Sequence, residues 1–176
     1  MAFDQWLLGA LWRPSTTYLN LKEPGTPTLG WILLAIFSLE SAGALFTPTA
    51  ADGPTASVGA LLTTVFLLLA LLHLYQSTLL LAAARWAGWS LPWAGANRLI
   101  TLSWSTVLVE DVVTLPLALT GQWSLVTTIG ILCSLWQLIS LSRGISALSG
   151  WDRRRSVAVA LFAVVPYRLL LLLFFS

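Results

Sequence analysis

Long apolar stretches, separated by short polar or glycine- and proline-rich breaks, dominate the pattern along this chain. Five of these stretches come close to the roughly 20 residues that an α-helix needs to cross about 30 Å of hydrocarbon. They cover residues 29–46, 58–84, 99–119, 123–148 and 156–175. Only about three residues separate the third stretch from the fourth, so these two helices are expected to form an antiparallel hairpin. The pattern predicts an all-α membrane protein in which residues 29–176 form a bundle of five transmembrane helices.

Residues 1–28 precede the first predicted span and have a different pattern. Apolar side chains recur there at helical spacing as far as Leu11, and Pro14 is expected to end this turn of helix. Trp6 and Trp12 favour the headgroup zone of a bilayer, where indole rings concentrate. We therefore interpret residues 1–28 as a cytoplasmic segment with one short interfacial helix.

The positions of arginine and lysine predict the orientation of the bundle. Arg13 and Lys22 precede the first span, Arg85 and Arg98 flank the loop after the second, and Arg153, Arg154 and Arg155 follow the fourth. The loops after the first and third spans carry no arginine or lysine. By the positive-inside rule, the N-terminus lies in the cytoplasm and the C-terminus lies outside.

Composition supports a membrane location and excludes several classes of function. Hydrophobic residues make up 57% of the chain and charged residues only 9%, whereas about a quarter of a soluble protein is charged. The net charge of +2 and the lack of a basic stripe argue against a nucleic-acid partner. One cysteine and one histidine leave too few ligands for a typical zinc or haem site, so we expect no metal and no cofactor.

Aromatic and basic residues gather in the predicted cytoplasmic loops. Trp86 and Trp89 follow the second span, and the arginine run 153–155 follows the fourth. Indoles at this level are typical of the aromatic belt of a membrane protein, and the arginine run is interpreted first as a signal for orientation. Together these residues are the candidates for contact with lipid headgroups or with partner proteins.

Five ionisable residues are predicted to share one level inside the membrane: Glu40, His73, Glu110, Asp111 and Arg168. Counted at 1.5 Å per residue from the cytoplasmic ends of their spans, all of them fall about 16–20 Å deep. Such residues are costly in lipid and usually face the interior of a bundle. Because three carboxylates accompany one arginine and one histidine, we expect Arg168 to meet Glu110 or Asp111.

This ionisable layer allows several interpretations. The groups can simply hold the helices together, or they can form a proton- or cation-linked site in a small transporter or channel-like subunit. A water-filled cavity that admits another ligand is a further alternative. An intramembrane enzyme is the weakest interpretation, since no HExxH, GxSxG or P-loop motif and no convincing pair of nucleophile and base is present. We therefore expect no catalytic residues.

The order of features resembles the YIP family (Ypt-interacting proteins), whose members have five spans and a cytosolic N-terminus. The resemblance is carried by Leu11-Trp12-Arg13-Pro14 with Tyr18, by the glycine-containing loop 87–98, and by Trp136, Leu138 and Gly144 in the fourth span. The resemblance extends over nearly the whole chain and is to bacterial-type members of the family, for which a bacterial cytoplasmic membrane is the expected location. It implies an integral membrane adaptor or organiser without enzymatic activity, which binds lipids, other membrane proteins or a second copy of itself.

Overall fold

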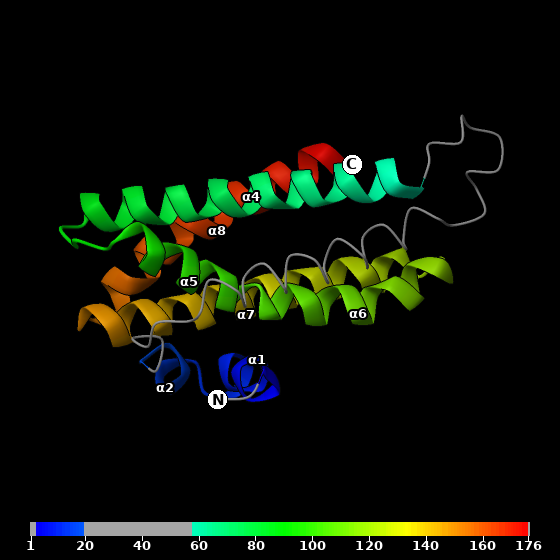
Figure 1. Cartoon of the computed structure of the whole chain (residues 1–176). Helices are drawn as coiled ribbons and strands as arrows, with labels where there is room; N and C mark the ends of the chain where they lie inside the picture. The colour runs from blue at the N-terminus through cyan, green and yellow to red at the C-terminus, as the bar shows by residue number, and fades with distance from the viewer. Residues whose placement is uncertain (1–2, 20–57, 176) are drawn as a thin grey trace.

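The computed structural model describes residues 3–19 and 58–175, and every regular element in these two ranges is an α-helix (Figure 1). The helices are α1 (Phe3–Trp12), α2 (Pro14–Leu19), α4 (Val58–Trp86), α5 (Trp93–Ser103), α6 (Ser105–Leu119), α7 (Trp123–Ser149) and α8 (Arg153–Phe175). The all-α class predicted from the sequence is confirmed for this part of the chain. The first predicted span, residues 29–46, and its Glu40 lie outside the described residues.

Three segments in the described ranges are long and apolar enough to cross a membrane. They are Thr63–Trp86, Trp93–Leu119 and Trp123–Ser149, with mean hydropathies of 2.0, 1.4 and 1.7. No more than a third of the most apolar stretch of each segment is buried inside the protein. Large apolar side chains therefore cover the outside of the bundle, as expected of helices that are solvated by lipid rather than by water.

Helix α7 is the centre of the arrangement and contacts α2, α5, α6 and α8. Helix α8 packs against both α7 and α4 (Figure 1). Helices α6 and α7 form the antiparallel hairpin expected from the sequence. Gly121 makes their short connection possible because its φ of +73° belongs to the left-handed region that glycine tolerates.

The third predicted span differs from the prediction, because it is not one helix over residues 99–119. The helical segment begins earlier, at Trp93, and is interrupted at Trp104, where α5 ends and α6 takes a new direction (Figure 1). Hydroxyl groups surround the interruption. Ser103 Oγ, Ser105 Oγ and Thr106 Oγ1 donate to the carbonyls of Ile100, Leu102 and Ser103 at 2.8, 2.7 and 2.7 Å. The Ile100 carbonyl also accepts from the Trp104 amide at 3.0 Å, so it is shared between a hydroxyl and a backbone amide. Hydroxyl groups that bond to the helix backbone in this way often bend a helix without a proline.

The N-terminal segment also differs from the single interfacial helix expected. Pro14 begins a second helix rather than only ending the first, which suits a residue without an amide hydrogen at the first helical position. The two helices pack on the bundle, and Tyr18 of α2 is fully buried. A Cβ atom at Gly144 of α7 would lie 2.7 Å from the Tyr18 ring, so only glycine allows this approach. Ser140 Oγ of α7 donates to the carbonyl of Ala10 at 3.2 Å.

Candidate functional site

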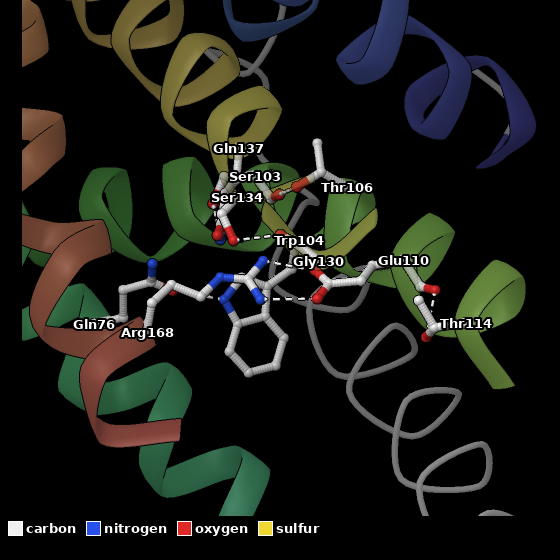
Figure 2. Close-up of polar contacts among 10 residues, drawn as sticks. All are labelled: Gln76, Ser103, Trp104, Thr106, Glu110, Thr114, Gly130, Ser134, Gln137 and Arg168. Atoms are coloured by element: carbon white, nitrogen blue, oxygen red, sulfur yellow. Dashed lines mark hydrogen bonds and ion pairs between the residues drawn. The ribbon is translucent and has the colours of Figure 1, made fainter. Parts of the chain in front are cut away.

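An ion pair between α6 and α8 is the clearest feature of the interior. Arg168 Nη1 donates to Glu110 Oε1 at 3.2 Å and Nη2 donates to Oε2 at 2.8 Å, so the two planar groups meet edge to edge (Figure 2). The side chains are only 18% and 15% exposed, Arg168 first. A bidentate pair of this kind is stronger and more directional than a single contact. The expected contact between Arg168 and an acidic residue of the third predicted span is present.

Helix α7 supplies the surface on which the Glu110 carboxylate lies. A Cβ atom at Gly130 would be 3.2 Å from Glu110 Oε1, so the absence of a side chain at Gly130 makes room for the carboxylate. Asp111 is half-buried, and both of the Arg168 bonds go to Glu110 rather than to it. Asp111 still contributes to the electrostatic field at Arg168. Glu110 is therefore the carboxylate that bonds to Arg168, and Asp111 adds to the negative field around the guanidinium.

His73 of α4 contacts two polar residues of α5. Its Nε2 lies 2.5 Å from Asn97 Oδ1 and 3.4 Å from Thr101 Oγ1, both on α5. The indole of Trp104 meets the imidazole edge to face, with ring centres 5.0 Å apart. These are amide, hydroxyl and aromatic partners, so the structure does not bring His73 to the carboxylates through any of these contacts. Because Asn97 Oδ1 accepts hydrogen bonds, the close contact favours a proton on Nε2.

Trp104 connects three helices at the break between α5 and α6. Its Nε1 donates to Gln76 Oε1 of α4 at 2.6 Å (Figure 2). The centre of its ring lies 5.8 Å from that of Tyr167 on α8. Gln137 of α7 joins this group of buried polar side chains, because its Nε2 donates to Ser103 Oγ at 3.5 Å. Trp104, Gln76 and Gln137 are almost fully buried. The polar interior is therefore assembled around the interrupted helix.

Five buried atoms of this interior have no hydrogen-bond partner among the described residues. They are His73 Nδ1, Gln76 Nε2, Ser77 Oγ, Gln137 Oε1 and Arg168 Nε. A buried polar atom without a partner costs about 1–3 kcal/mol. The interior thus contains hydrogen-bonded pairs, such as Arg168 with Glu110, beside buried atoms that could still bond to another polar group.

Sequence reasoning missed three contributors to this interior: Asn97, Thr101 and Trp104. Asn97 stood in the predicted loop before the third span, and Trp104 is one of 10 tryptophans, so neither was singled out. The signal that could have found Trp104 is its place inside the run Ser103-Trp104-Ser105-Thr106. An indole flanked by three hydroxyl residues at mid-span indicates an amphipathic side chain in a polar interior.

The described residues contain no group of three or more histidine, cysteine, aspartate or glutamate side chains that could hold a metal ion. No protein-family model, no curated protein and no solved structure matches this chain.

A second cluster lies where the loops 87–92 and 150–152 come together, at what we call the arginine end of the bundle (Figure 1). Arg155, in the first turn of α8, donates through Nη2 to the carbonyl of Ala87, which follows α4. Its guanidinium lies over the Trp151 ring, 4.2 Å from the ring centre. Trp151 in turn meets Trp89 edge to face, with ring centres 5.7 Å apart. Arg155 thereby ties the two loops together.

The other candidates for headgroup contact are placed by the structure on the surface of the same end. Trp86 is 91% exposed, and Arg153 and Arg154 are exposed in the first turn of α8. Of the predicted group, Trp89 and Arg155 have defined structural contacts, whereas Trp86, Arg153 and Arg154 extend outward. The arginine end therefore has a fixed inner part and a charged outer part.

Proposed function

We propose that this chain is a non-enzymatic integral membrane protein that organises partners within a bilayer. It binds other membrane proteins, lipids or a second copy of itself through its spans and loops, and its buried ionisable layer stabilises the bundle. The observation that supports this most directly is the bidentate pair between Glu110 and Arg168. Each carboxylate oxygen of Glu110 accepts a hydrogen bond from one terminal guanidinium nitrogen of Arg168. This arrangement is expected of a structural pair.

The proposal includes five spans, with the N-terminus in the cytoplasm and the C-terminus outside, in a bacterial cytoplasmic membrane. Support comes from the distribution of charge, because Arg85 and the arginines 153–155 lie at the same end of the bundle. The positive-inside rule assigns that end to the cytoplasm. The resemblance of the sequence to the YIP family, whose members have five spans, agrees with this topology and with an adaptor role.

Paired substitutions at Glu110 and Arg168 test the structural role of the pair. Removing one partner leaves a buried charge, so Glu110→Gln and Arg168→Gln are each expected to lower stability by about 3–5 kcal/mol. The double variant should recover most of this loss, since it leaves no unpaired charge. Thermal unfolding in a mild detergent measures the effect, and Arg13→Gln, at an exposed position, is the matched control. Single variants as stable as the original chain would contradict the proposal.

Partner binding is measured separately from stability. The chain is produced in native membranes with a photoreactive group in place of the exposed Leu132 of α7. After illumination, the crosslinked products are identified. A defined partner or a dimer is the expected product. A chain that stays monomeric and uncrosslinked at every exposed apolar position of α6 and α7 would contradict the organising role.

A second candidate function is a small proton- or cation-linked transporter or channel-like subunit. The observation that favours it is the group of buried atoms that keep bonding capacity, His73 Nδ1 and Arg168 Nε among them. Polar groups of this kind, inside a bundle and beside an interrupted helix, are typical of ion and proton pathways. Proteoliposomes with an internal pH dye test this function. Proton entry that is lost in both His73→Gln and Glu110→Gln supports it, and flux no higher than in empty liposomes excludes it.

A further inference from the structure

A groove runs between the last turn of α4 and the first turns of α8, next to the arginine end. Its volume is about 310 Å³, and small or apolar side chains line most of it: Ala83, Ala87, Ala158, Val159 and Phe162. Arg155 and Trp86 complete the lining. Phe162 lies seven residues from Arg155 along α8, so the apolar part extends about 10 Å from the charged part along the helix axis. The groove therefore has an apolar part and a cationic end.

The charge around the cationic end is strongly one-sided. Arg85, Arg153, Arg154 and Arg155 are all exposed there, and Asp152 is the acidic residue in the adjoining loop. Asp152 is itself engaged, because its Oδ1 accepts from the backbone amide of Arg155 at 3.2 Å. A ligand that neutralises this end must be an anion.

Arg155 is held in the orientation that such an anion requires. The Ala87 carbonyl accepts one of the five guanidinium N–H groups, and the Trp151 ring supports the planar face. The remaining N–H groups keep their geometry, and a guanidinium fixed in this way binds phosphate through two parallel hydrogen bonds. Because the side chain is already ordered, binding costs little side-chain entropy.

From these features we infer that the groove between α4 and α8 is a binding site for an anionic phospholipid. The phosphate of the lipid bonds to Arg155, the neighbouring arginines balance the headgroup charge, and one acyl chain lies along Ala83, Ala158 and Phe162. A soluble phosphate ester would satisfy only the cationic end, whereas a phospholipid matches both parts of the groove. Trp86 lies at the level of the headgroup, where indole rings are favoured.

This inference rests on the proposed function only for the placement of the chain in a bilayer. It adds a defined lipid class and a defined position to a general capacity for binding partners. Lipid binding in the groove does not depend on the stability of the Glu110–Arg168 pair or on crosslinking through α7. Each proposal can therefore fail while the other stands.

Native mass spectrometry of the full chain in detergent tests the site, with phosphatidylglycerol and phosphatidylcholine of identical acyl chains as probes. The chain should retain phosphatidylglycerol at least about fivefold better. Arg155→Gln should abolish this preference and leave the weaker retention of phosphatidylcholine. Ala158→Phe fills the groove and should reduce the retention of both lipids. Arg13→Gln and Ala82→Phe, at exposed positions that do not line the groove, are the matched controls.

Two results would overturn the inference. One is equal retention of the two lipids by the original chain. The other is an unchanged preference in Arg155→Gln together with unchanged retention in Ala158→Phe. Inorganic phosphate at millimolar concentration serves as a competitor: it should displace little lipid, and full displacement would show that the cationic end binds phosphate without using the groove. Thermal unfolding of each variant shows whether it is folded. If Arg155→Gln does not fold, the retention of lipid by Ala158→Phe still tests the site.

Discussion

The carboxylate of Glu110 lies against the backbone of Gly130, where a Cβ atom would approach Oε1 to 3.2 Å. The carboxylate has little freedom to move away, because both of its oxygens are bonded to Arg168. The glycine and the ion pair are therefore expected to behave as one unit, in which a change on α7 is felt by the contact between α6 and α8.

Substitution of Gly130 should have different effects in two backgrounds. In the original chain, Gly130→Ala crowds the carboxylate, which should cancel the roughly 0.5–1 kcal/mol that alanine normally gains over glycine inside a helix. In a Glu110→Ala background the crowding is gone, so Gly130→Ala should stabilise by about that amount. Thermal unfolding of the four proteins gives the coupling between the sites. Equal effects of Gly130→Ala in both backgrounds would contradict the coupling.

Gly144→Ala should separate the N-terminal helices from the bundle. The new methyl group would lie 2.7–2.8 Å from three atoms of the Tyr18 ring, which is fully buried and cannot turn away. Overpacking of this kind costs about 1–3 kcal/mol. Limited proteolysis within α1 and α2 and thermal unfolding both report the loss. Tyr18→Phe is the control, because it keeps the ring and removes only the phenol hydroxyl, with its long 3.4 Å bond to the Leu99 carbonyl and its hydrogen bond with Ser140.

The docking of α2 should weaken in alkaline solution. Burial raises the pKa of the Tyr18 phenol above its usual value, and a hydrogen bond with Ser140 opposes only part of this effect. A group whose pKa is higher in the folded state contributes its full stability below the unfolded pKa, about 10 for tyrosine, and loses it as the pH rises further. The original chain should therefore lose stability above about pH 10 more steeply than Tyr18→Phe. Parallel curves for the two proteins would contradict this prediction.

Trp104→Phe should cost more than the loss of one hydrogen bond. Gln76 Oε1 accepts from Trp104 Nε1 at 2.6 Å, and Gln76 Nε2 has no partner among the described residues. The variant leaves a buried amide without this bond, which costs about 1–3 kcal/mol. Adding Gln76→Leu removes the amide and should recover part of the loss. A double variant less stable than Trp104→Phe would show that Gln76 has another role.

The helices that cross most of the bundle could be predicted from hydrophobic length alone. The stretches 58–84, 123–148 and 156–175 correspond to α4, α7 and α8, and each differs from its helix by one to three residues at one end. Such segments have one property in common, a long apolar run between breaks, and the cost of exposing backbone groups in lipid makes the helix the expected structure.

The break at Trp104 could not be predicted in the same way. Hydropathy and helical spacing treat Ser103, Ser105 and Thr106 as polar side chains that face other helices. In the structure each of their hydroxyl groups bonds to a carbonyl of its own chain segment. Ser134 likewise donates to the Gly130 carbonyl within α7. Spacing shows where a hydroxyl lies on a helix, but not whether it bonds to its own backbone or to a neighbour.

Part of the candidate site was accessible from the sequence. A buried arginine needs a counter-ion, so the contact between Arg168 and Glu110 follows from the cost of charge in lipid. Depth alone did not reveal that His73 bonds to Asn97 and Thr101, since a residue's depth does not determine which neighbour it faces. Glu40 lies outside the described residues.

The packing of Ala10 and Tyr18 on α7 has a consequence for biosynthesis. Ser140 follows its partner Ala10 by 130 residues, so α1 and α2 cannot dock on α7 until that much more of the chain has been made. At about 5–20 residues per second, this delay is roughly 7–26 s. During that interval the bilayer surface or a chaperone can cover the side chains of α1 and α2 that later pack on α7, so helices that are made early reach their final place late.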